Sequence, residues 1–258
     1  MSVPTGHKRI ASAGVLDVSR RAFGSKGRGV KSKTLQGKSL QYIALEPDAY
    51  DPSRPLPMVV LAHGFGSNMA DLAGLAELID SHGYVYVCSN APIEMRFGFR
   101  ETGYAWADRY DRSTSEQWRS AEEKLNVLVD ETMESYGVPP GKVVLGGFSQ
   151  GGMMSFLCGL TRPELYAGII AMSAGLPDPE GLQSRLPQGN KPPVFISHGD
   201  MDSMIPVDEA RDARVFLESE GYSVYYREYR MGHQITHDVL RDLKAWLGPV
   251  LPPGPLKL

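Results

Sequence analysis

Long apolar segments are missing from this 258-residue sequence. A membrane-spanning helix needs about 20 consecutive apolar residues, and no run in the chain approaches that length, so the sequence predicts no membrane span. Cysteine is also scarce, because the chain has two, Cys88 and Cys158. Neither has another cysteine or a histidine at the spacing of a zinc site. We therefore expect two buried thiols in a reducing compartment and no metal site.

Acidic residues are rare in the first 38 positions, which contain nine Lys or Arg and one Asp. The remainder holds 18 basic and 29 acidic residues, and an acidic body argues against nucleic acid as a partner. The basic segment lacks the apolar core of a secretory signal, and we expect a cytoplasmic protein. We interpret residues 1–38 as a flexible, solvated extension, with a pairing strand or a transit-like segment as alternatives.

From residue 39 onward, short β-branched runs alternate with segments of helical periodicity. A run such as MVVLAHG at 58–64 is typical of a strand buried on both faces. We expect strands at 39–45, 58–64, 84–92, 142–147, 167–174, 193–199 and 223–229, and helices at 69–83, 115–136, 150–161, 207–220 and 236–247. The alternation predicts an α/β fold with a mostly parallel central sheet and helices on both faces. Neither a repeat nor a linker interrupts it, so we expect one domain at 39–250 and a Pro-rich tail at 251–258.

Glycines crowd around one serine in GGFSQGG at 146–152, directly after the apolar run KVVL. The stretch contains Gly-x-Ser-x-Gly at Gly147, Ser149 and Gly151, where an expected strand passes into a helix. A serine in such a sharp turn has strained backbone angles, which small flanking residues make possible. The turn lifts the hydroxyl above the sheet edge, beside the positive end of the next helix. Ser149 is therefore a candidate nucleophile, with an idle serine in a Gly-rich turn as the alternative.

A serine nucleophile needs a base, and the base needs a carboxylate that fixes its tautomer. In this class of fold the expected chain order is serine, acid, histidine. His233 lies in the loop after the last expected strand and is the candidate base, with a solvated loop histidine as the alternative. His198 precedes any suitable acid, and His237 falls inside the last expected helix, where it cannot be aimed freely.

The acid is expected in the stretch HGDMDSMIPVDEA, which begins at the end of the strand at 193–199. A carboxylate that reaches sideways to a histidine from a tight turn needs an apolar wall behind it. Met-Ile-Pro at 204–206 supplies that wall after Asp202, which is the candidate acid. Asp200 is the alternative, and its other interpretation is a side chain that caps the turn.

The negative oxygen formed during attack on a carbonyl needs two hydrogen-bond donors. One candidate is the backbone N–H of Gln150, directly after the serine. The other is the N–H of Phe65, in the loop AHGFGSN at 62–68, because glycines let that loop turn its amides inward. His63 is expected to hold the loop in place.

Aromatic residues are concentrated in MRFGFRETGYAWADRY at 95–110, before the helix expected at 115–136. From this position the segment can fold over the mouth of the serine site. Glycines and charged residues interleave with the aromatics, which favours a partly mobile wall that contacts an acyl chain. Phe97, Phe99 and Trp106 are the candidate substrate-binding residues. A loop that packs in the core is the alternative.

Several of these motifs occur together, in the same order, in one known family. They are HGFG at 63–66, AWAD at 105–108, GGFSQGG at 146–152, HGDMD at 198–202 followed by IPV, and MGH at 231–233. Their combination resembles the phospholipase/carboxylesterase family of α/β-hydrolases, which contains acyl-protein thioesterases and small bacterial esterases. The resemblance spans roughly residues 40–248. It implies an α/β-hydrolase fold and hydrolysis of carboxylic esters or thioesters without a metal or an organic cofactor.

The combined interpretation is a serine carboxylesterase that cleaves short- to medium-chain esters through Ser149, His233 and Asp202. A thioesterase or lysophospholipase of the same family is the alternative, because one triad serves alkoxide and thiolate leaving groups alike. A non-catalytic ligand-binding protein on the same fold is a more distant alternative. We expect a small-molecule ester or thioester as the partner, no nucleic acid, no cofactor, and a monomer or homodimer.

Overall fold

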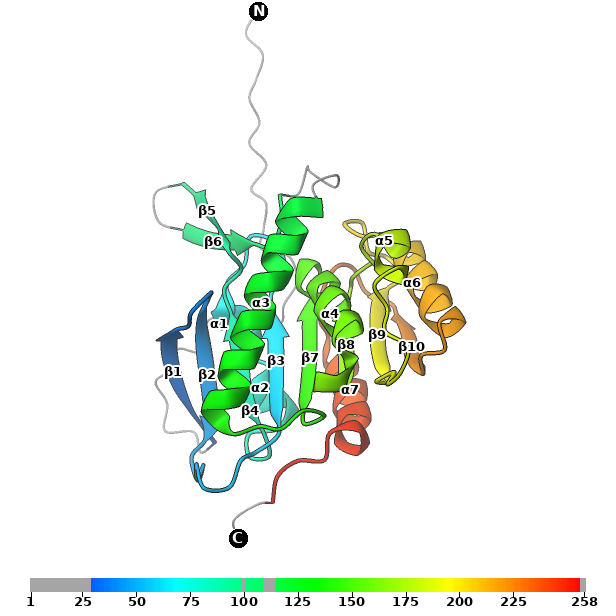
Figure 1. Cartoon of the computed structure of the whole chain (residues 1–258). Helices are drawn as coiled ribbons and strands as arrows, with labels where there is room; N and C mark the ends of the chain where they lie inside the picture. The colour runs from blue at the N-terminus through cyan, green and yellow to red at the C-terminus, as the bar shows by residue number, and fades with distance from the viewer. Residues whose placement is uncertain (1–28, 99–100, 109–114, 256–258) are drawn as a thin grey trace, which may run out of the picture.

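The computed structural model describes residues 29–98, 101–108 and 115–255 and shows an α/β architecture (Figure 1). Eight strands of the described chain form one sheet. In spatial order they are β1 (Val30–Gln36), β2 (Gln41–Pro47), β4 (Val85–Ser89), β3 (Met58–Ala62), β7 (Val143–Phe148), β8 (Tyr166–Met172), β9 (Val194–Gly199) and β10 (Val224–Tyr229). The pairs β1–β2 and β2–β4 are antiparallel and the others are parallel. The predicted mostly parallel sheet is confirmed.

Helices cover both faces of the sheet (Figure 1). One buried cluster joins the sheet to α3 (Ser115–Tyr136), α4 (Gln150–Thr161) and α6 (Val207–Ser219), and the other joins it to α1 (Met69–Ala73), α2 (Ala76–Ile79) and α7 (His237–Val250). The short helices η1 (Pro163–Leu165) and α5 (Pro179–Gln183) lie in connections. None of the described helices is both long and apolar enough to cross a membrane.

The parallel strands end at one edge of the sheet, and this edge gathers the candidate residues. Parallel pairing aligns the end of β3 with β7, the end of β7 with β8, and the end of β9 with β10. The loops that follow β3, β7, β9 and β10 carry Phe65, Ser149, Asp202 and His233 respectively. Binding sites of open α/β sheets lie at this carboxyl edge, so the topology alone places the candidates close together.

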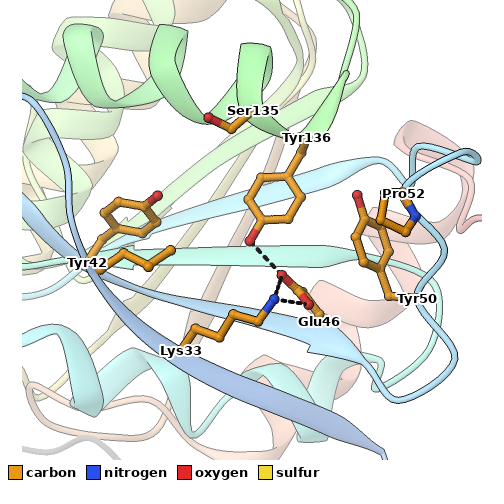
Figure 2. A pocket seen from close by; sticks show the side chains of 8 residues that line it. Lys33, Tyr42, Glu46, Tyr50, Pro52, Ser135 and Tyr136 are labelled. Atoms are coloured by element: carbon orange, nitrogen blue, oxygen red, sulfur yellow. Dashed lines mark hydrogen bonds and ion pairs between the residues drawn. The ribbon is translucent and has the colours of Figure 1, made fainter.

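The sheet begins earlier than the domain start expected at residue 39. Val30–Gln36 form β1, which pairs with β2 along its whole length. Lys33 Nζ lies 2.8 Å from both carboxylate oxygens of Glu46, which also accepts a hydrogen bond of 2.9 Å from the Tyr136 hydroxyl (Figure 2). The prediction of a solvated extension through residue 38 is therefore wrong for residues 30–36, which form the pairing strand that was the alternative. Residues 1–28 lie outside the described residues.

Two other boundaries differ from expectation. The helix expected at 69–83 is divided into α1 and α2 and ends at Ile79, because Asp80 is extended and its side chain accepts the N–H groups of His82 and Gly83. The first residue of the tail expected at 251–258 is packed against the rest of the protein. Leu251 is buried, and its carbonyl accepts a hydrogen bond from the Tyr84 hydroxyl.

Removing β1 should weaken the fold without changing the chemistry. A chain that starts at Ser39 loses the β1–β2 hydrogen bonds and the Lys33–Glu46 ion pair, and its free energy of unfolding should fall by about 2 kcal/mol. For a chain of this size, Tm should fall by about 4–8 °C. The ratio kcat/KM should not change, because three strands separate β1 from β7. Thermal unfolding and ester hydrolysis, compared with a chain that starts at Gly29, test this; an unchanged Tm would contradict it.

Candidate active site

Ser149 lies in the turn between β7 and α4 with φ 56° and ψ −121°, a strained conformation for a residue other than glycine. Glycines make the turn possible through close backbone contacts. A Cβ at Gly147 would collide with the Gly151 backbone, and a Cβ at Gly151 would collide with the Ala62 carbonyl of β3. The sequence-based explanation of GGFSQGG as room for a sharp strand-to-helix turn is confirmed.

Three side chains from three loops form one line of hydrogen bonds. His233 Nε2 lies 3.0 Å from Ser149 Oγ, and His233 Nδ1 lies 2.7 Å from Asp202 Oδ2. An ionised carboxylate can only accept, so the proton is assigned to Nδ1 and Nε2 offers its lone pair to the serine hydroxyl. The Phe148 ring packs on the His233 ring with 4.7 Å between centroids. The serine and the histidine are thus within reach for transfer of the hydroxyl proton.

Asp202 is enclosed and well supplied with donors. Its Oδ1 accepts hydrogen bonds from the N–H groups of Met204, at 2.8 Å, and Ile205, at 3.0 Å. Burial alone would raise the pKa of this carboxyl, but hydrogen bonds from His233, Ile205 and Met204 outweigh it and hold the pKa of Asp202 below its usual value. The carboxylate is therefore charged at neutral pH. Asp200, the alternative acid, is exposed, and the structure brings Asp202 to His233 instead.

The loop with Phe65 is fixed by the buried ring of His63. His63 Nε2 accepts the N–H of Ala91 at 3.1 Å, so Nδ1 carries the proton and donates to the Gly64 carbonyl at 2.7 Å. Burial lowers the pKa of His63 to about 4, although the bond to Gly64 opposes this, and the ring stays neutral. The C=O and N–H of a trans peptide point in opposite directions. The N–H of Phe65 therefore points away from the ring, in a peptide whose Gly64 Cα lies against Ser149.

The side chain of Gln150 links this loop to the serine turn. Its Oε1 accepts the N–H of Trp106 at 3.0 Å, and its Nε2 donates to the Ala107 carbonyl at 2.8 Å. The Trp106 indole then donates to the His63 carbonyl at 2.9 Å. These bonds connect both candidate oxyanion donors through one buried network. Sequence reasoning used only the backbone of Gln150, because its partners lie about 44 residues away and no periodic pattern reveals them.

The described aromatic residues of the segment at 95–110 lie in different surroundings. Trp106 is completely buried in the core, so its prediction as a substrate-contacting residue is wrong: its indole N–H instead binds the His63 carbonyl, in the loop that carries Phe65. Phe97 is 40% exposed, and its ring lies against Gly66 and Gly103. Phe97 is thus the candidate wall residue that the structure places beside the loop of Phe65. Phe99 lies outside the described residues.

Residues Ile93–Phe97 and Glu101–Ala105 form the strands β5 and β6 of a hairpin, which stands apart from the main sheet at its upper edge (Figure 1). Two backbone hydrogen bonds attach it to the loop that carries Phe65. The N–H of Gly66 donates to the Tyr104 carbonyl at 2.8 Å, and the N–H of Tyr104 donates to the Ser67 carbonyl at 2.7 Å. The hairpin therefore extends the loop that carries Phe65 and presents Phe97 beside it.

The other two downstream histidines lie where they cannot serve Ser149. His237 is the first residue of α7 and is exposed. His198 is fully buried at the end of β9, where its Nε2 lies 3.4 Å from Asp202 Oδ2 and 2.8 Å from the Ile205 carbonyl. Sequence reasoning considered His198 only as a base and missed this contact with the acid.

A cavity of about 430 Å³ in the described chain lies away from Ser149 (Figure 2). It is lined by residues of β1, β2, the following turn and the end of α3: Lys33, Leu35, Tyr42, Glu46, Tyr50, Pro52, Ser135 and Tyr136. None of the candidate catalytic residues lines it, so the line through Ser149, His233 and Asp202 is the better candidate for chemistry. Among the described residues, no group of three or more His, Cys, Asp or Glu could hold a metal ion.

Known proteins resemble this chain over most of its length. It is 28% identical over 223 residues to acyl-protein thioesterase 1 of Mycosarcoma maydis, covering 77% of this chain and 93% of that protein. It is 30% identical over 216 residues to acyl-protein thioesterase 1 of Kluyveromyces lactis, covering 77% and 94%. The crystal structure of esterase PE8 superposes with a TM-score of 0.69 at 28% identity, covering 86% of this chain and 100% of that one.

The family assignment comes from the sequence match that contains the candidate site. Residues 51–250 match the family described as phospholipase/carboxylesterase. This range includes the serine turn, the acid loop and the histidine loop, and it leaves out β1 and β2. The chain belongs to the phospholipase/carboxylesterase family of α/β-hydrolases and is a serine hydrolase.

Proposed function

We propose that this protein hydrolyses carboxylic esters of short to medium acyl chains through a triad of Ser149, His233 and Asp202. The observation that carries the proposal is the unbroken line of two hydrogen bonds, 2.7 Å from Asp202 to His233 and 3.0 Å from His233 to Ser149. A serine hydroxyl becomes a useful nucleophile when an oriented neutral imidazole accepts its proton.

In the first half of the reaction, Ser149 Oγ attacks the ester carbonyl carbon while its proton moves to His233 Nε2. Asp202 stabilises the resulting imidazolium through the bond to Nδ1. The tetrahedral intermediate then breaks its bond to the alcohol oxygen, which takes the proton from Nε2 and leaves. The acyl group remains on Ser149, so the nucleophile has exchanged a proton for an acyl group.

The backbone N–H groups of Phe65 and Gln150 are proposed to hold the negative oxygen of the intermediate. His63 turns the first of these peptides, and the second is the first amide of α4, where the helix dipole adds positive potential. In the second half of the reaction, water gives a proton to His233 and attacks the acyl carbon. The acid leaves, and Ser149 regains its proton.

Thioester hydrolysis is the second candidate, supported by the two relatives named acyl-protein thioesterase 1. The same triad can expel a thiolate, and a lysophospholipase would use the same steps. A panel of nitrophenyl esters of increasing chain length, measured beside one acyl-thioester, separates the candidates by kcat/KM. A clear preference for the thioester at equal acyl length would replace the proposed activity, whereas hydrolysis of neither substrate would favour the non-catalytic alternative.

Truncating Phe97 should change which acyl chains are accepted. Its ring is 40% exposed beside the oxyanion loop, so Phe97→Ala should widen the acyl site and move the preferred chain length upward. One methylene in such a pocket is worth about 1–3 kcal/mol, so the shift should be graded, with KM changing more than kcat. The nitrophenyl ester panel measures it. Val127→Ala on α3, where the side chain is 42% exposed, is the matched control; an unchanged profile for Phe97→Ala would assign Phe97 to the scaffold.

A further inference from the structure

His198 is a buried titratable residue that the proposed reaction does not use. It lies at the end of β9, four residues before Asp202, and its side chain is fully buried. Its Nε2 is 2.8 Å from the Ile205 carbonyl and 3.4 Å from Asp202 Oδ2. The same carboxylate oxygen accepts the bond from His233. The acid is therefore flanked by two imidazoles, of which only one reaches Ser149.

The hydrogen bonds of His198 fix the position of its proton. A carbonyl oxygen can only accept, so Nε2 carries a hydrogen that points to Ile205, while Asp202 Oδ2 lies 3.4 Å from the same nitrogen. The other nitrogen, Nδ1, is buried and has no hydrogen-bond partner among the described residues. A second proton on Nδ1 would be a buried donor without an acceptor, which is unfavourable. The geometry thus favours one neutral tautomer.

We propose that His198 is a positioning residue, a neutral donor that holds the Asp202 carboxylate and the Asp202–Ile205 turn so that Oδ2 faces His233. Its single N–H binds the carbonyl at one end of the turn and contacts the carboxylate at the other. The inference rests on the proposed triad. Without this donor the carboxylate would still accept two backbone N–H groups at Oδ1, but its second oxygen would be free to rotate away from His233.

The charges around His198 are compatible with a neutral ring. Asp202, His233 and Glu228 are close enough to act on its charge, and Glu228 is its partner position on β10. Glu228 is already paired with Arg211 of α6 at 2.8 Å. Burial lowers the pKa of His198 in spite of these carboxylates. A neutral His198 places an N–H group 3.4 Å from Asp202 Oδ2 without cancelling the negative charge that stabilises the His233 imidazolium.

Three substitutions separate positioning from packing. His198→Gln keeps an N–H donor near the Nε2 position, His198→Asn places its donor near the Nδ1 position, and His198→Leu removes the donor at similar volume. Ser197→Ala is the control, because Ser197 is the neighbouring buried residue on the same strand and its hydroxyl has no partner among the described residues. The readouts are kcat, KM and the low-field proton resonance of the His233 Nδ1–H bond, all measured on the full chain.

The Asn and Leu variants should lose about 10- to 100-fold in kcat with KM little changed, because a misplaced base slows the chemical step. Their low-field resonance should shift or broaden, while the Gln variant and the control stay close to wild type. If the Asn and Gln variants behave alike, either both impaired or both normal, the proposal is overturned. This comparison does not depend on whether the Leu variant folds. The resonance does not depend on turnover. If the wild-type protein shows the resonance but no esterase activity, the proposed function is rejected. The role of His198 is then tested by comparing the resonance of the Asn and Gln variants.

Discussion

Replacing Ser149 by Ala should lower kcat by about 10³-fold or more and leave the fold intact. The change removes the nucleophile, while the oxyanion donors and the substrate contacts remain and give the residual rate. Alanine and serine both carry the Cβ atom that causes the steric strain at φ 56°, so the turn should gain little strain. Steady-state hydrolysis of a nitrophenyl ester, with circular dichroism to confirm folding, measures the loss.

The matched control for this variant is Ser155→Ala. Ser155 is also buried on α4, but its hydroxyl bonds to the Gly151 carbonyl of its own helix rather than to a histidine. Its loss should leave kcat nearly unchanged. A Ser149→Ala enzyme within tenfold of wild type would show that another group attacks the substrate.

Removing the imidazole of His233 should cost as much as removing the serine. In His233→Ala no group accepts the proton of Ser149 Oγ, so kcat should again fall by about 10³-fold or more. His237→Ala is the control, because that residue is exposed on α7 and should lose little. Comparing kcat for the two variants on one ester is the measurement, and reversed losses would move the base to His237.

The pH profile follows from the same line of residues. On the acid side kcat/KM should fall with unit slope, because attack needs the neutral imidazole of His233. Asp202 should add no second step near neutral pH, since hydrogen bonds to its carboxylate hold its pKa below the usual value and keep it charged there. His63 adds none either, because burial lowers its pKa to about 4. A slope of two would show that a second group must be deprotonated.

The interior of the sheet could be predicted from the sequence because its strands are buried on both faces. Strands β3 and β7 are continuous apolar runs, and the helix expected at 150–161 matches α4 at both ends. Edge strand β1 could not be found in this way. Nearly all of its side chains are exposed, so it has no alternation between buried and exposed positions, and its lysines and polar residues are typical of a solvated segment.

The residues of the candidate site likewise divide into those that strand ends and chain order constrain and those that only the folded chain brings together. Ser149 and His233 could be named because strand ends and chain order constrain them, and the choice of Asp202 over Asp200 agrees with the contact to His233. The side chains that support these residues could not be named. The bonds of His63 and Gln150 join segments far apart in the chain, the contacts of His198 depend on the fold of a tight turn, and Trp106 is buried although its neighbours suggested an exposed wall.

Location and assembly stay predictions. The sequence predicts a cytoplasmic protein that is a monomer or a homodimer. Gel filtration with light scattering measures the oligomeric state directly.

The most direct measurement is the site at which a fluorophosphonate attaches. The reagent reacts with a serine whose hydroxyl is activated by a neighbouring base, so it reports the chemistry without assuming a substrate. Digestion and mass spectrometry of the treated protein should place one adduct on Ser149, and Ser149→Ala and His233→Ala should not be labelled. An adduct on a different residue, or labelling that persists in Ser149→Ala, would contradict the assignment of the nucleophile.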